Sequence, residues 1–129
     1  MTTGYATTLR NAQLDPITTA VGNAGKLQIY DGTRPATGGT ATVKLAEFTL
    51  GSPFAPAAAA GVLSPTLPSA TTGITAGTAT WFRITTSGGT FVLDGSAGTS
   101  GTDLVLNTAS ISAGVNVTVS GFSITRGNP

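Results

Sequence analysis

The sequence predicts an all-β protein, an antiparallel β-sandwich of jelly-roll character that is preceded by a short helical arm. From Lys26 onward, apolar and polar residues alternate with the period of two that marks half-buried strands. The chain has 18 Gly and 7 Pro among its 129 residues, so strands are short and turns frequent. In two of the predicted strands the apolar residues also change from odd to even positions part-way along. Such a change is typical of a β-bulge, where a strand bends from one sheet into another. This length fits a single domain, residues 1–129, with the arm at 1–22 and the sandwich at 26–126.

The first 22 residues have a helical rather than a strand pattern. Asp15 and Pro16 suit the N-cap and first position of a helical turn, so we expect the helix to break there and restart. Gly22 and Gly25 then end the arm. Apolar residues recur at helical spacing in two groups, Tyr5, Leu9 and Ala12, and then Leu14, Ile17 and Val21.

Two strands separated by a loop follow the arm. Residues 26–30 alternate, and Asp31-Gly32 is a strong turn signal. The second strand is predicted over Thr42–Leu50, with Val43 and Leu45 on one face. Between residues 45 and 47 the parity changes, which indicates a β-bulge or a bend.

Residues 51–76 form the least regular part of the chain, because four prolines prevent long hydrogen-bonded ladders. We expect short extended segments along a sheet edge. Their core anchors are predicted to be Phe54, Val62, Leu63 and Leu67.

Residues 78–86 and 90–93 predict a β-hairpin around a Ser-Gly-Gly turn, with Asp94-Gly95 closing its second strand. Trp81 and Phe82 are adjacent on the first strand and point to opposite faces. One is expected in the core, and the other is either covered by the arm or exposed as a contact.

The C-terminal part continues with short strands at residues 104–106 and near Ile111. The valines of segment 115–119 alternate with polar residues and predict a half-buried strand. The parity shifts at Gly121, which indicates a second bulge or corner and places Phe122 and Ile124 on the buried side.

The composition argues against an enzyme. The chain has no Cys and no His, which removes the commonest general base and metal ligand. The serines therefore have no histidine to activate them, and the glycine-rich run that starts at Gly95 lacks the lysine of a phosphate loop. Asp31 and Asp94 both precede glycine, where aspartate ordinarily caps a turn. We expect no catalytic residues, no cofactor and no metal.

Charged residues are sparse, with six basic and five acidic side chains and a net charge of +1. The cations are scattered singly along the sequence, so nucleic acid is not an expected partner. Such a surface presents little repulsion to a neighbour, which suits a protein packed against others. No signal-like N-terminus or membrane-spanning run is visible, so we expect synthesis in the cytoplasm and no membrane partner.

Four segments carry a resemblance to one family that extends over nearly the whole chain. One of them is 29–41, Ile-Tyr-Asp-Gly-Thr-Arg-Pro-Ala-Thr-Gly-Gly-Thr-Ala, and its block Tyr30–Thr40 is the most specific part. The others are the opening 1–25, the segment Gly77-Thr-Ala-Thr-Trp-Phe-Arg-Ile84, and the close Ile124-Thr-Arg-Gly-Asn128. On these segments the sequence resembles a family of small structural proteins of tailed bacteriophages.

The resemblance implies a virion component, similar in size and β content to the cement, or head-decoration, proteins that bind the outside of a capsid. Its partners would be the major capsid protein and further copies of the chain in a dimer or trimer, on the capsid exterior after synthesis in the bacterial host. A ligand that binds only the assembled shell stabilises it by mass action, and many copies need only modest affinity each. A tail or baseplate component and a receptor- or glycan-binding module remain alternatives.

Two segments are the candidates for contact with a partner, the arm Thr2–Gly22 and the loop Tyr30–Thr40. If the arm makes the contact, deletion of Thr2–Asp15 should leave a folded domain that associates less well with the particle. The loop after the first strand is equally readable as a simple hairpin turn. The candidate residues are Tyr5 and Leu9 in the arm, Tyr30, Asp31, Gly32, Thr33, Arg34 and Pro35 at the loop, and Trp81 in the hairpin.

Overall fold

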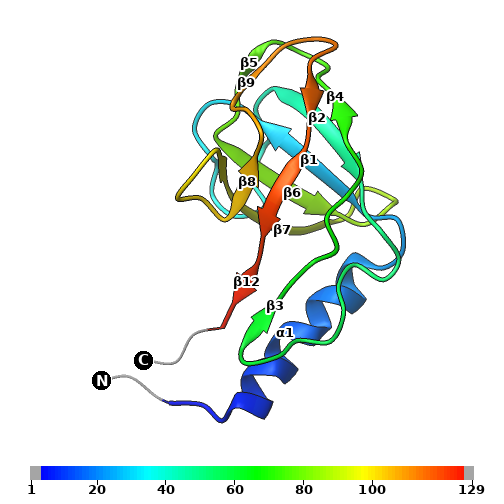
Figure 1. Ribbon diagram of the computed structural model, residues 1–129, viewed down its shortest axis with the longest axis vertical. Coiled ribbons are helices and arrows are strands. Elements are labelled where there is room, and N and C mark those ends of the chain that lie inside the picture. The colour runs from blue at the N-terminus through cyan, green and yellow to red at the C-terminus, as the bar shows by residue number, and fades with distance from the viewer. Residues whose placement is uncertain (1–3, 127–129) are drawn as a thin grey trace.

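The computed structural model describes residues 4–126 and confirms a mostly β fold with one helix (Figure 1). Strands account for 36% of the chain and helix for 12%. The elements are α1 (Thr7–Val21), β1 (Lys26–Tyr30), β2 (Lys44–Thr49), β3 (Val62–Leu63), β4 (Thr71–Thr72), β5 (Gly77–Thr78), β6 (Trp81–Thr85), β7 (Phe91–Gly98), β8 (Leu104–Leu106), β9 (Ser110–Ile111), β10 (Asn116–Val117), β11 (Val119–Phe122) and β12 (Ile124–Thr125).

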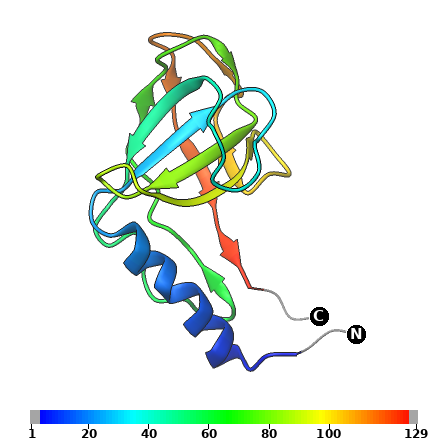
Figure 2. The same ribbon diagram turned by 180° about the vertical axis from the view of Figure 1, so that it is seen from behind.

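A curled sheet of six strands organises the molecule, in the order β11-β8-β7-β6-β1-β2 (Figure 2). The predicted hairpin is present as β6 and β7, which pair antiparallel. Its second strand is not closed at Asp94-Gly95 as predicted, because β7 continues to Gly98. Asp94 lies opposite Arg83 in the register, and this cross-strand pairing outweighs the local turn tendency of Asp-Gly.

The pairing of β7 with β8 is parallel, so the expectation of a wholly antiparallel fold is wrong. The loop between these two strands is closed by Asp103. Its carboxylate accepts hydrogen bonds from the Ser96 backbone N–H at 3.0 Å and the Ser96 hydroxyl at 3.1 Å. The Asp103 N–H donates back to the same hydroxyl at 3.0 Å. This reciprocal contact returns the chain to the side of β7 in the same direction.

Both predicted bulges are confirmed. The register between β1 and β2 skips Leu45, and the register between β8 and β11 skips Ser120, the residue before Gly121. Each extra residue reverses the side-chain parity downstream, which is why Leu45 and Ala46 are both buried.

The C-terminal segment takes part in several ladders in turn. β10 pairs with β4, β11 pairs with β8 in the large sheet, and β12 pairs with β3. A further two-stranded ladder joins β5 and β9. In Figure 1 this segment runs along the length of the molecule. One bent stretch of chain therefore ties the parts of the fold together.

Helix α1 is continuous, so the predicted break at Pro16 is wrong. A proline within a helix removes one backbone hydrogen bond, here the bond to the Ala12 carbonyl. Leu14 and Val21 are buried on the two sides of Pro16 and hold both halves of the helix against the core. Asp15 does not cap a helix either, because its carboxylate accepts a hydrogen bond from the Ala58 N–H at 2.7 Å. In the part of the chain that the structure describes, no helix is both long and apolar enough to cross a membrane.

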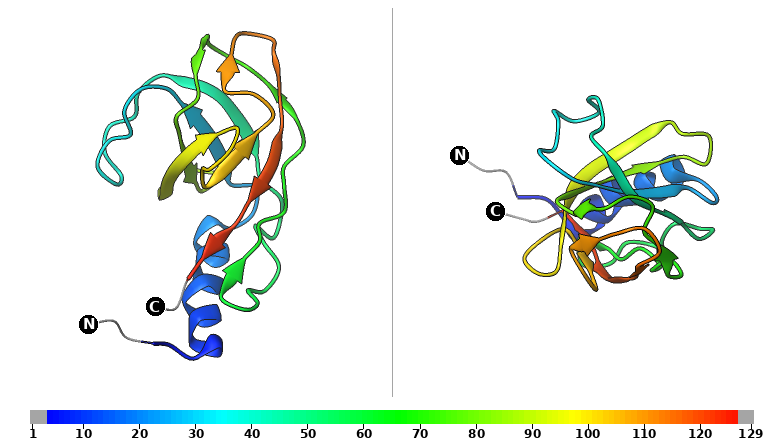
Figure 3. Two further views of the ribbon diagram at one scale, coloured as in Figure 1. Left: turned by 60° about the vertical axis from the view of Figure 1, so that its left-hand side comes forward. Right: turned by 90° about the horizontal axis from the view of Figure 1, so that it is seen from above.

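The helix projects beyond the sheet together with β3 and β12 (Figures 1 and 3). We call this part, residues 5–21, 58–63 and 124–126, the stalk. Polar contacts join its segments: the Gly61 N–H donates to Asn11 Oδ1 at 2.9 Å, and Arg126 Nε donates to Gln13 Oε1 at 2.9 Å. The arm is thus part of the folded body.

The main core lies between the concave side of the sheet, α1 and the irregular segment 51–66. Phe54 and Leu63 are buried anchors as predicted. Val62 is half-buried, and Leu67 is 43% exposed, so the prediction that Leu67 is a core anchor is wrong. The remaining large core residues, each less than 2% exposed, include Phe48, Phe82, Leu27, Ile29, Leu45, Ile84, Leu104, Val21 and Val117.

Candidate interaction surface

A row of polar residues crosses the face of the sheet opposite the main core. Glu47, Gln28, Arg83 and Asp94 lie side by side in register on β2, β1, β6 and β7. Gln28 donates to Glu47 Oε2 at 3.0 Å, and Lys44 forms an ion pair with the same oxygen at 3.0 Å. The alternation that puts apolar residues into the core therefore places a hydrogen-bonded row on the other face.

The pair of Arg83 and Asp94 anchors this row. Arg83 Nε and Nη2 donate to the two carboxylate oxygens at 2.7 Å and 3.0 Å, a bidentate geometry. The side chains are 11% and 1% exposed, so the pair is shielded from water. The hydrogen bond to Asp94 raises the pKa of Arg83 above its ordinary value.

Aromatic rings enclose the guanidinium. Trp81 and Phe91 lie on either side in the register, with their ring centres 5.2 Å and 5.1 Å from Arg83 Cζ. Tyr30 stacks on Trp81 at 4.4 Å, and its hydroxyl donates to Gln28 Oε1 at 2.9 Å. Burial raises the pKa of the Tyr30 phenol above its ordinary value. The result is a rigid platform beneath the following loop.

The loop 31–42 is fixed to this platform at its base. Trp81 Nε1 donates to the Asp31 carbonyl at 3.0 Å, and Thr80 Oγ1 donates to the Gly32 carbonyl at 2.6 Å. The Asp31 carboxylate accepts from the Val43 N–H at 3.1 Å, which joins the two ends of the loop.

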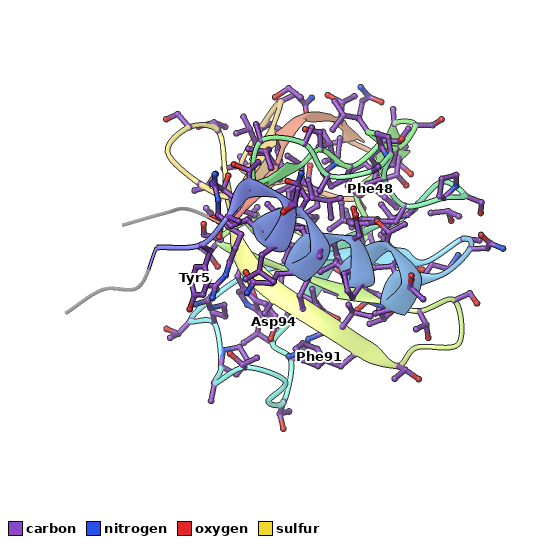
Figure 4. All side chains as sticks on the ribbon, turned by 90° about the horizontal axis from the view of Figure 1, so that it is seen from below. Tyr5, Phe48, Phe91 and Asp94 are labelled. Atoms are coloured by element: carbon purple, nitrogen blue, oxygen red, sulfur yellow. The ribbon has the colours of Figure 1, made fainter. Side chains whose placement is uncertain are left out.

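The far part of the loop is fixed by the buried ion pair itself. Arg83 Nη2 donates to the Gly39 carbonyl at 2.8 Å, and the Gly38 N–H donates to Asp94 Oδ2 at 3.1 Å. Asp94 and Phe91 project from β7 toward this loop (Figure 4). Gly38 has φ +76, so a side chain there would be strained, and a β-carbon at this position would come into contact with the Phe91 ring at 3.4 Å.

The predicted contact residues fall into three environments. Trp81 is 1% and Tyr30 is 6% exposed, so both are covered by the chain's own loop and serve as its support. Gly32, Thr33 and Arg34 are exposed on the loop, whereas Asp31 and Pro35 are half-buried. Tyr5 and Leu9 belong to the stalk, where Leu9 is 47% exposed.

Sequence reasoning missed the part played by Arg83, Asp94 and Phe91. Plain extension of the predicted hairpin would pair Asp94 with Phe82, because the turn places Thr85 opposite Phe91. A register shift between Ile84 and Thr85 brings Asp94 opposite Arg83 instead, and the sequence pattern carries no signal for that shift. The approach of loop residues 38 and 39 to this pair has no local signal at all.

All five acidic side chains of the chain hold its own structure together. Asp15, Asp31 and Asp103 accept hydrogen bonds from backbone N–H groups, whereas Glu47 and Asp94 form ion pairs. Burial alone would raise the pKa of Glu47, but hydrogen bonds from Gln28 and Lys44 lower it below its ordinary value. Residues 4–126 contain no group of three or more carboxylates or other typical metal ligands.

A shallow groove of about 350 Å³ lies between α1, β7 and the turn from β11 into β12. Its walls are largely apolar, with Ile17 on the helix and Phe82 and Phe122 on the sheet side. Asp103 reaches its rim but is already bonded to Ser96. The groove is therefore a gap in side-chain packing between helix and sheet.

Comparison of the chain with protein-family models, with curated proteins and with solved structures returns no match.

Proposed function

We propose that the chain is a structural protein of a tailed-phage virion, a cement protein that binds the outer surface of the assembled head. The observation that carries the proposal is the fixed loop 31–42. It presents Gly32, Thr33 and Arg34 to solvent while its base and far part are bonded to a buried platform. A loop already ordered before binding loses little conformational entropy when it meets a partner.

The character of the whole surface supports the same proposal. Only eleven side chains carry charge, and among residues 4–126 ion pairs neutralise two of the six cations, Lys44 and Arg83. A surface with so little repulsion suits dense packing of many copies on a shell. We also infer that the curled sheet and its small ladders form a β-sandwich of jelly-roll type, which the bent segment 116–125 supports.

The decisive experiment measures copy number. Purified virions are digested, and this protein is quantified against the major capsid protein by mass spectrometry with labelled peptide standards. We expect a copy number comparable to that of the capsid protein. A few copies per particle would indicate a tail or baseplate component, and absence from the particle would reject the virion assignment.

A loop variant tests the surface itself. Arg34→Glu reverses the exposed charge of the loop, whereas Lys26→Glu reverses a charge at the start of β1, the end of that strand opposite the loop. Both proteins are mixed with heads that lack the wild-type protein, and bound protein is measured by sedimentation. We expect Arg34→Glu to reduce decoration and Lys26→Glu to leave it nearly unchanged; equal effects would mean that the loop does not make the contact.

A further inference from the structure

Two arginines that are far apart in the sequence meet at the stalk. Arg10 Nη1 donates to the Arg126 backbone carbonyl at 3.3 Å, across a separation of 116 positions. Arg10 Nη2 donates to Thr7 Oγ1 at 3.1 Å. The fold therefore brings the Arg10 guanidinium to the backbone of Arg126, although the two residues lie at opposite ends of the described chain.

The partners seen for these two guanidinium groups are neutral. Arg126 Nε donates to the Gln13 side-chain oxygen at 2.9 Å, and its Cζ lies 5.7 Å from the centre of the Tyr5 ring. Within residues 4–126, neither arginine has a carboxylate at ion-pair distance, in contrast to Lys44 and Arg83. Arg10 Nε is buried and has no hydrogen-bond partner among the described residues. The stalk thus carries two positive charges, on Arg10 and Arg126, that have no carboxylate at ion-pair distance among residues 4–126.

The start of α1 adds to this positive potential. The N-cap residue Ala6 has no side chain that could accept a hydrogen bond, and the first turn contains no acidic residue. The first backbone N–H groups of the helix and its dipole therefore favour a negative charge at the same end.

We propose that this end of the stalk, around Arg10 and Arg126, binds a carboxylate-bearing segment of a partner protein. Arg126 is exposed and offers donors to an incoming carboxylate, and a guanidinium matches that group in a planar, two-bond geometry. A nucleic acid would need a longer row of cations to neutralise successive phosphates. The chain's net charge of +1 and its two clustered arginines fit a short acidic peptide better.

The test uses the full chain and a deca-glutamate peptide, with deca-glutamine as the uncharged control. Binding is followed by NMR chemical shifts of the backbone amides of residues 5–13 and of the arginine Nε–H groups. We expect saturable shifts at this end of α1 and at Arg126, and weaker binding at 0.5 M than at 0.05 M NaCl because exposed charges are screened. Arg126→Gln should weaken binding by about threefold, as expected for an exposed ion pair.

Matched variants separate a specific site from general attraction. Arg126→Lys keeps the charge but loses the planar pair of donors, so its affinity should lie between those of the wild type and Arg126→Gln. Arg34→Gln removes a distant exposed arginine and should have no effect. Far-UV circular dichroism checks that each variant is folded. If Arg126→Gln is unfolded, the proposal is judged from the residues whose chemical shifts change in the wild type and from the affinity of Arg126→Lys. Equal loss in Arg34→Gln, shifts outside the stalk, or equal binding of deca-glutamine would overturn the proposal. Tighter binding of a ten-nucleotide oligothymidylate would overturn it in favour of nucleic acid. Because no phage particle is used, this result is independent of the virion proposal.

Discussion

At the scale of single residues, the fold depends on a few positions where side chains meet without spare room. The ion pair between Arg83 and Asp94 is one of them, because both charges have left water and each is held by the other. Gly95 is another, since a β-carbon there would lie 2.5 Å from Phe82 Cε1. Asp94 and Gly95 are adjacent residues of β7, so the buried ion pair with the loop and the close contact with Phe82 in the core lie next to each other.

Removing the buried carboxylate should be strongly destabilising. Asp94→Asn leaves Arg83 buried without a counter-charge and should lower the free energy of unfolding by about 3–5 kcal/mol. Glu47→Gln breaks a pair whose side chains are 38% and 31% exposed, and should cost at most about 1 kcal/mol. Urea denaturation of both variants checks this contrast, and similar midpoints would refute it.

The glycine prediction compares two sites near the same hairpin. Gly95→Ala forces the Phe82 ring to move and should cost about 1–3 kcal/mol, as overpacking does. Gly88→Ala has only Thr86 Oγ1 nearby, at 3.9 Å, and should change stability by no more than about 0.5 kcal/mol. Thermal unfolding followed by circular dichroism distinguishes the two; an unchanged transition in Gly95→Ala would contradict the packing described for β7.

Tyr30 makes stability depend on alkaline pH. Its pKa is raised in the folded state, so the neutral phenol is favoured by folding. Its contribution is complete below the unfolded pKa of about 10 and is lost as the pH rises through the folded pKa. Between pH 9 and 11 the wild type should lose more stability than Tyr30→Phe. Parallel curves of unfolding free energy against pH would show that Tyr30 is not the cause.

At the scale of elements, α1 is a structural part of the molecule as well as a possible contact. Leu14 is 3% exposed, and the polar residues Arg10, Asn11 and Asp15 bind backbone groups of other segments. Deletion of Thr2–Asp15 would therefore remove core packing together with any binding surface. Surface substitutions on the helix are the cleaner test of a contact.

Two leucines of this helix provide a matched comparison. Leu14→Ala should cost about 2–5 kcal/mol because it opens a cavity in the core. Leu9→Ala removes a side chain that is 47% exposed and should change stability by no more than about 0.5 kcal/mol. Guanidinium denaturation measures both, and a small effect of Leu14→Ala would mean that the helix is only loosely attached.

The elements also show what sequence patterns can and cannot predict. Alternation identified β1 and the hairpin, and the changes of parity identified the bulges at Leu45 and Ser120, because burial on one face imposes that pattern locally. Pro16 and Asp94 were misread, because packing and a cross-strand charge outweighed their local tendencies. The parallel direction of β8 depends on a contact between Ser96 and Asp103 that no periodicity reveals.

At the scale of the whole molecule, the exposed loop 31–42 and the stalk are separate features of one small body. The loop lies against the polar face of the sheet. The stalk, which contains α1, β3 and β12, extends away from the sheet (Figure 3). Of the candidate site, the loop was predictable from its turn residues. The meeting of Arg10 with Arg126 was not, since it joins opposite ends of the described chain.

The pairing of β12 with β3 has a consequence for the order in which the protein is made. During synthesis α1 emerges before β12, yet both border the same segment around Gly61, which accepts a hydrogen bond from the Arg126 N–H at 2.8 Å. Arg126, whose carbonyl accepts from Arg10, is made 116 positions later than Arg10. Contacts so distant in sequence favour slow folding, so the stalk is expected to be among the last parts of the described fold to be completed.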